Sequence, residues 1–282
     1  MKYLFIVFLT FSLGVACSHK ELKEQGKSSN PYTQCQVAKE YITALEFLRS
    51  NKEWLASDSQ AQEIASKVAQ GCDGAARRFI KVSSVLMKAE LGTRDSMNLG
   101  VQFANSTDPK AETFLAVFKM SYLKSHLDLD LVSSVKTAKS LSLEYKYDDG
   151  FVAKDFSEFV SFCSGESKLD LPKPECARFS RRLAGVGYKY KEPVYKPFYK
   201  AFEFLISEEG PQMPTHNALK YAEKIVNQGP LAVNNFIAAF KYGKSDKGLK
   251  LSYKDAIKFA DNISIGSSRA IASESEKGKK TK

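Results

Sequence analysis

Apolar residues recur at helical spacing over most of this chain, and the same arrangement returns about every forty residues. The clearest markers are four phenylalanines separated by 42, 42 and 38 positions, namely Phe114, Phe156, Phe198 and Phe236. Tyr41 and Phe79 are weaker, earlier markers of the same kind. Periods near 40 residues are typical of stacked helical pairs. The pattern therefore predicts an all-α protein built from tandem helix pairs.

Each repeating unit contains two helical stretches separated by a turn. In the last unit, Phe236 and Phe240 mark the first helix, and residues 243–248 form a glycine-containing break. Ser252 has the character of a helix N-cap, and an apolar stripe follows it. The equivalent helix starts in the other units are Asp130, Pro172 and Pro214.

A single helical pair cannot bury its own apolar face, so five or six such units would have to stack on one another. The period and the two-helix unit resemble the HEAT and armadillo families over roughly residues 36–264. The resemblance implies an α-solenoid of antiparallel helix pairs, with a long surface that binds a protein or a polymer. The complete signatures of tetratricopeptide and ankyrin repeats are missing.

The amino terminus has the features of a secretory signal peptide over residues 1–16. Lys2 precedes an apolar run over residues 3–13, which is too short to span a bilayer, and small residues follow it. The end of this segment resembles the lipobox of bacterial lipoproteins, which implies cleavage before Cys17 and lipidation of that residue. Ordinary signal peptidase cleavage stays open as the alternative. We expect an exported protein, anchored through its lipid to the outer membrane and facing the periplasm or the cell surface.

Composition then divides the rest of the chain. Residues 17–34 are polar and lack apolar periodicity, so they predict a flexible tether. Residues 35–264 form the predicted helical repeat domain, and residues 265–282 form a basic tail that we expect to be mostly disordered.

The number of cysteines in the chain supports export. If Cys17 carries the lipid, four cysteines remain, which suits two disulfides in an oxidising compartment, namely Cys35, Cys72, Cys163 and Cys176. The locally closest pairing joins Cys163 to Cys176 across one turn and Cys35 to Cys72 near the start of the domain. A zinc site is the alternative, but no Cys-x-x-Cys and no nearby histidine favours it.

The sequence offers little material for catalysis. The folded part contains two histidines, His126 and His216, and no common hydrolase, nucleotide or dinucleotide motif occurs. We therefore expect no cofactor, no metal and no enzymatic activity. An envelope enzyme that cleaves glycans is the alternative, and it would need a cleft holding a carboxyl with a raised pKa.

The chain carries 42 Lys and Arg against 32 Asp and Glu, a net charge of +10. An exported basic protein meets anionic partners, so we expect a protein or an anionic envelope polymer as ligand and no nucleic acid. Aromatic and basic residues alternate between Tyr188 and Lys200, and the candidate binding residues in this segment are Lys189, Lys191, Tyr195, Lys196, Tyr199 and Lys200. The competing interpretation is that the rings pack between repeats while the lysines reach solvent.

Overall fold

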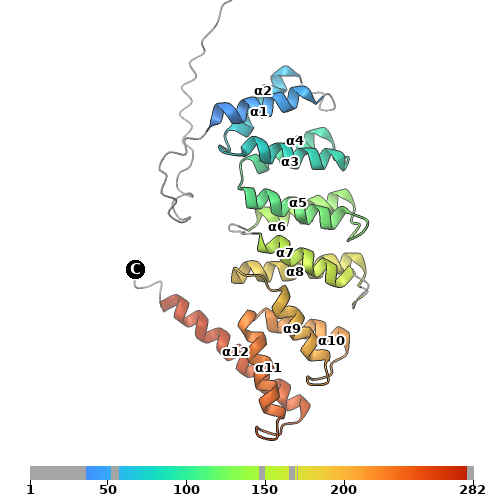
Figure 1. The fold of residues 1–282 in the computed structure, drawn as a ribbon, viewed down its shortest axis with the longest axis vertical. Helices are drawn as coiled ribbons and strands as arrows, with labels where there is room; N and C mark the ends of the chain where they lie inside the picture. The colour runs from blue at the N-terminus through green and yellow to red at the C-terminus, as the bar shows by residue number, and fades with distance from the viewer. Residues whose placement is uncertain (1–35, 52–56, 146–149, 165–168, 170, 278–282) are drawn as a thin grey trace, which may run out of the picture. The chain divides into compact units, whose positions relative to one another are not determined.

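The computed structural model describes residues 36–51, 57–145, 150–164, 169 and 171–277, and within residues 266–277 it describes only the helical backbone. The predicted signal peptide, the tether, Cys17 and Cys35 lie outside the described residues. All regular secondary structure in the described part is helical, as the sequence predicts (Figure 1). The chain divides into two compact units, Met1–Thr107 and Asp108–Lys282.

The first unit contains two helix pairs. In each pair the two helices pack together, and α1 also packs on α3 while α2 packs on α4. Phe79, Leu86 and Phe103 are completely buried in its core. The helices are α1 (Val37–Ser50), α2 (Asp58–Ala69), α3 (Ala75–Lys88) and α4 (Thr93–Ala104).

The second unit contains four helix pairs: α5 with α6, α7 with α8, α9 with α10, and α11 with α12. The first helices of successive pairs pack on one another, α5 on α7, α7 on α9 and α9 on α11, so the pairs stack as in an α-solenoid (Figure 1). The helices are α5 (Asp108–Tyr122), α6 (Leu131–Leu143), α7 (Phe151–Ser164), α8 (Lys173–Tyr190), α9 (Tyr195–Ile206), α10 (Thr215–Val226), α11 (Pro230–Lys244) and α12 (Tyr253–Lys277).

The period read from the sequence is confirmed by burial. The four marker phenylalanines lie in α5, α7, α9 and α11, the first helices of the four pairs, and none is more than 1% exposed. The second helices carry small residues at one equivalent position, all with no exposed surface, namely Ala138, Ser180, Ala222 and Ala260. Small buried side chains at this position allow the two helices of a pair to approach closely.

The turns inside three of the pairs share one hydrogen bond. The backbone N–H of Leu129, Met213 or Leu251 donates to the carbonyl eight positions earlier, at 2.8 Å in each case. Two of these turns contain a glycine, Gly210 or Gly248, where a Cβ would collide with the carbonyl oxygen of the preceding helix. The repeat therefore extends to the backbone of the turns.

The second helices begin where the sequence predicts. Asp130 caps α6 by accepting the N–H of Ser133 at 2.9 Å, and Ser252 accepts the N–H of Asp255 at 3.2 Å beside the start of α12. Pro172 and Pro214 are the N-caps of α8 and α10.

The carboxyl end differs from the expected boundary. The helix α12 continues to Lys277, beyond residue 264, into the segment for which we expected mostly disorder. Ala270, Ala272, Glu274 and Glu276 are good helix formers, and no proline interrupts this segment. None of the described helices is long and apolar enough to cross a membrane.

An aromatic cluster joins α7, α8 and α9. The ring of Phe198 meets Phe159, Phe179 and Phe162 with centroids 5.3, 5.5 and 5.8 Å apart, all near edge-to-face. Such contacts add about 0.5–1.5 kcal/mol per pair to the burial of the rings. Phe198 therefore belongs to its own pair and to the preceding one at the same time.

We expect Phe198→Ala to lower the free energy of unfolding by about 3–5 kcal/mol, because it leaves a cavity where two pairs meet. Tyr242→Ala is the control, since this ring is 54% exposed and its loss should change stability by less than about 0.5 kcal/mol. Urea titration followed by circular dichroism measures both. Equal effects of the two substitutions would contradict the role of Phe198 in joining the pairs.

Candidate functional site

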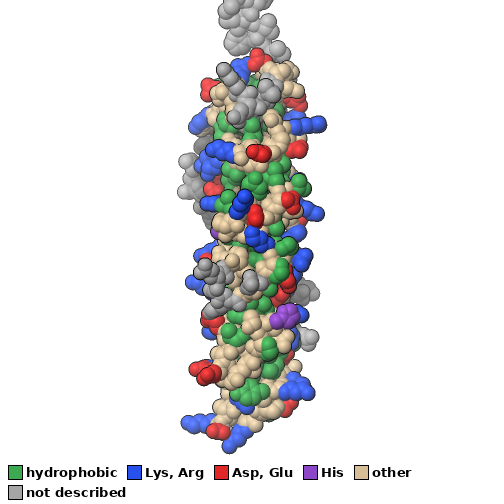
Figure 2. Space-filling view, turned by 90° about the vertical axis from the view of Figure 1, so that its right-hand side faces the viewer, with side chains coloured by type: hydrophobic (Ala, Val, Ile, Leu, Met, Phe, Trp, Pro, Cys, Tyr) green, Lys and Arg blue, Asp and Glu red, His purple; other side chains and the backbone are tan. Residues whose placement is uncertain are grey.

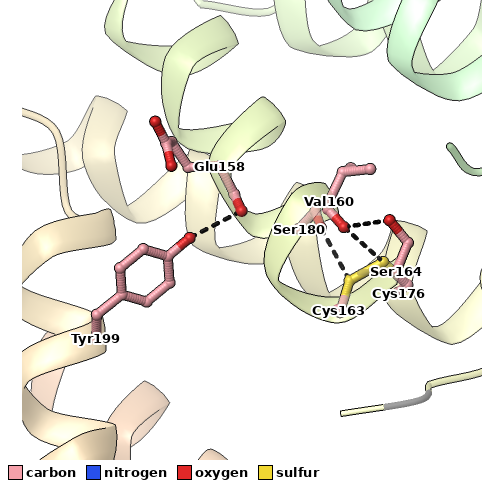
Figure 3. Close-up of a disulfide and its surroundings, with 7 residues drawn as sticks. All are labelled: Glu158, Val160, Cys163, Ser164, Cys176, Ser180 and Tyr199. Carbon is pink, nitrogen blue, oxygen red and sulfur yellow. Dashed lines mark hydrogen bonds between the residues drawn. A yellow bond between two sulfur atoms is a disulfide. The ribbon is translucent and has the colours of Figure 1, made fainter. Parts of the chain in front are cut away.

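The tyrosine–lysine segment runs from the end of α8 through a turn into α9. Its rings are largely occupied by packing. Tyr195 is only 9% exposed, and the hydroxyl of half-buried Tyr199 donates to the carbonyl of Glu158 at 2.8 Å (Figure 3). Burial raises the pKa of the Tyr199 hydroxyl, and the nearby Glu158 carboxylate adds to that effect. Packing encloses the Tyr195 ring almost completely, and the half-buried Tyr199 ring packs against Phe159 and Phe162, which counts against a stacking role for the two residues.

The other two tyrosines also join neighbouring pairs. Tyr188 stacks on Tyr145 with ring centroids 4.1 Å apart, and the hydroxyl of Tyr190 donates to the carbonyl of Asn227 at 2.8 Å. The ring of Tyr190 lies against Gly229, which has a φ of 120° and so occupies a conformation that favours glycine. These contacts support the packing interpretation of the rings.

The lysines of the segment reach solvent. Lys189, Lys191, Lys196 and Lys200 are all exposed. Lys189 lies over the Tyr190 ring, with 4.9 Å from Nζ to the centroid, and Lys200 donates to Oδ1 of Asn234 at 2.7 Å. A ligand of this segment would therefore meet mainly the charges of these lysines.

A buried carboxylate lies beside this segment. Asp155, on α7, has no exposed surface, and its two oxygens accept the backbone N–H groups of Val194 and Tyr195 at 2.9–3.0 Å. These N–H groups open α9, where no helical carbonyl is available to them and where the helix dipole favours negative charge. Asp155 thus caps the first helix of the following pair.

The surroundings of Asp155 are closely packed. A Cβ at Gly187 would collide with the carboxylate, so α8 approaches it through a residue without a side chain. Burial raises the pKa of Asp155 to about 6, against the opposite effect of the two N–H groups. A carboxyl enclosed in this way can hold a proton but has no route to a substrate.

The first unit contains the same arrangement. Glu40, on α1, is 8% exposed and accepts the N–H groups of Gly74 at 3.0 Å and Ala76 at 2.6 Å, at the start of α3. Glu40 precedes Tyr41 as Asp155 precedes Phe156, so both acids stand immediately before the aromatic marker of their repeat. The sequence analysis missed this role, and an acid directly before the aromatic marker of a repeat is the signal that could have revealed it.

The substitution Asp155→Asn tests the buried carboxylate. Its folded-state pKa of about 6 lies above the ordinary 3.8, so its protonation stabilises the fold. This contribution is complete below pH 3.8 and is lost as the pH rises through about 6. We expect the wild type to lose about 2–3 kcal/mol relative to the variant between about pH 4 and pH 7.

Urea titrations across this pH range measure the difference. Glu112→Gln, which removes an exposed carboxyl from α5, is the matched control and should give a curve parallel to the wild type. A parallel curve for Asp155→Asn as well would show that the Asp155 carboxyl does not titrate differently on folding.

The predicted disulfide between Cys163 and Cys176 is present, with Cα atoms 5.6 Å apart (Figure 3). It joins the end of α7 to the start of α8, and both residues have no exposed surface. Cys72 is also disulfide-bonded. Its predicted partner Cys35 lies outside the described residues, so that pairing stays a prediction.

Removing this disulfide with Cys163→Ala and Cys176→Ala should lower the free energy of unfolding by about 2–4 kcal/mol, because the closed loop no longer constrains the unfolded chain. Thermal unfolding with and without a reductant checks it. The reductant should lower the midpoint of the wild type more than that of the double variant. An equal shift in both proteins would argue against a stabilising role of this bond.

The two histidines are separate. His126 lies in the turn between α5 and α6, and exposed His216 lies in the first turn of α10. Among the described residues, no three His, Cys, Asp or Glu side chains come together as a metal site would require.

Comparison of the chain with protein-family models, with curated proteins and with solved structures finds no match in any of the three. The interpretation of function therefore depends on the chain's own residues and geometry.

Proposed function

We propose that this protein is an exported lipoprotein of the bacterial cell envelope that acts as a non-enzymatic binding scaffold. The disulfide between Cys163 and Cys176 supports export, because such bonds persist in oxidising compartments and are rare in the cytosol. The lipobox-like end of the signal segment supports an anchor at Cys17, and the outer membrane is its proposed place.

The observation that carries the scaffold role is the regular stacking of helix pairs in the second unit. We place this fold with the HEAT- and armadillo-like α-solenoids. The interior side chains of each repeat pack against one another. The exterior side chains at equivalent positions recur once in each helix pair and face solvent. Such a surface suits an extended partner, a protein or an anionic envelope polymer, that makes the same contact many times.

The surroundings of Asp155 favour a scaffold over a glycan-cleaving enzyme. Burial raises the pKa of the Asp155 carboxyl to about 6, as the general acid of such an enzyme would require. Both of its oxygens accept backbone N–H groups and the side chain is fully enclosed. A general acid needs the same pKa but must also reach the substrate.

Purification of the protein from its own envelope through a carboxyl-terminal tag tests both parts. Mass spectrometry should find an acylated peptide that begins at Cys17, and crosslinked material should contain a partner protein or polymer. An unrelated domain behind the same signal segment is the control and should carry the acyl chains without the partner. An unmodified amino terminus would contradict the anchor, and cleavage of envelope glycan by the purified protein would contradict the non-enzymatic role.

A further inference from the structure

The positive charge of the second unit is concentrated on one set of helices. The second helices α6, α8 and α10, with α12 through residue 265, carry eleven Lys and Arg against four Asp and Glu. The first helices α5, α7, α9 and α11 carry seven against five. Figure 2 shows one face of the molecule, on which acidic and basic side chains are interspersed.

Four of these basic residues occupy one equivalent position in the repeat. They are separated by 42, 42 and 38 residues, the same spacing as the marker phenylalanines, and are Lys136, Arg178, Lys220 and Lys258. All four are exposed, and none makes an ion pair or side-chain hydrogen bond with another described residue. We call these four residues the basic column.

Hydrogen bonds one helical turn further on show that the helices of the basic column lie side by side. Between α6 and α8, Nη2 of Arg181 donates to Oγ of Ser140 at 2.7 Å. Between α8 and α10, Arg182 donates to both carboxylate oxygens of Glu223 at 2.8 and 3.1 Å. Between α10 and α12, Lys224 lies 2.6 Å from a carboxylate oxygen of Asp261.

The same contacts explain why nearby acids do not pair with the basic column. Arg182 and Lys224 follow Arg178 and Lys220 by four residues, so each pair shares one helix face. Glu223 and Asp261, which lie three residues after Lys220 and Lys258, are engaged by the preceding helix. Glu175 and Asp255 lie one turn before Arg178 and Lys258 and offset only part of the field.

We infer that the basic column binds a linear anionic polymer with regularly repeated phosphate or carboxylate groups. Side-chain contacts bridge each neighbouring pair of these helices, so the four cations form a row along the second unit. A row of uncompensated charges at regular intervals suits a chain of identical anionic groups. This inference rests on the proposed scaffold role and names its ligand class.

A folded acidic protein fits this face less well. Protein interfaces usually centre on a desolvated apolar or aromatic patch. The described parts of α8 and α10 have no exposed large apolar side chain, and those on the outer two helices are scattered, namely Val132, Tyr253 and Ile263. The face therefore offers charge without the apolar centre that a protein partner would need.

The experiment compares three forms of the full chain in detergent. The column variant carries Lys136→Gln, Arg178→Gln, Lys220→Gln and Lys258→Gln. The control variant removes the same charge from four exposed lysines that lie outside the second helices and outside the tyrosine–lysine segment, through Lys119→Gln, Lys124→Gln, Lys154→Gln and Lys247→Gln. Thermal unfolding of each form establishes that the fold is retained. The probes are fluorescent inorganic polyphosphate for phosphate chains and polygalacturonate for carboxylate glycans, with binding followed by fluorescence anisotropy over a series of salt concentrations.

We expect the wild type to bind at least one polymer, the column variant to bind it at least about tenfold more weakly with a smaller dependence on salt, and the control variant to lose less than about threefold. Equal losses in both variants would overturn the inference, since net charge alone would then explain binding. Binding of neither polymer would also overturn it, as would capture of an acidic protein through the column. The envelope purification decides the scaffold role separately from all of these results.

Discussion

An amphipathic helix pair that cannot bury its own apolar face is the constraint on which this structure depends. Each pair covers one side of its neighbour and leaves a similar side for the next one. The rings of Phe159, Phe198 and Phe179 show this sharing directly, because they come from three helices in two pairs and meet as one cluster. The stability of such a chain comes mostly from the contacts between neighbouring helix pairs. A substitution at one of these contacts therefore destabilises two pairs at once.

Apolar burial alone does not fix the residue at which a helix begins. Buried polar groups that bind the first N–H groups of the helix fix it. Asp155 and Glu40 each accept the first N–H groups of a helix in the following pair, and each stands just before the aromatic marker of its repeat. Placing a carboxylate in the interior is costly unless its oxygens are satisfied. Burial raises the pKa of Asp155 even though the two N–H groups act in the opposite direction. The gain is a fixed start for α9 and, with it, for the aromatic cluster.

Surface side chains recur with the same period as the buried ones, but they are charged rather than apolar. The tyrosines between Tyr188 and Tyr199 contact residues of neighbouring helix pairs. The lysines of that segment remain exposed to solvent. On the second helices, some cations are neutralised by acids of the next helix while the basic column is not. Because the repeat places a cation at the same surface position in successive helix pairs, these cations form a row. Such a row can bind an extended partner through more contacts than a single site could.

The sequence by itself determined the period, the helix pairs, the starts of the second helices and the disulfide between Cys163 and Cys176, because each depends on local spacing or on residues close along the chain. Only the tertiary structure decided that Tyr195 is buried, that Asp155 caps α9, and that Arg182 rather than Arg178 is neutralised. Each of these facts depends on groups about forty residues apart that meet when the pairs stack. Which face of a helix meets its neighbour is set by packing, and packing is a property of the assembled repeats.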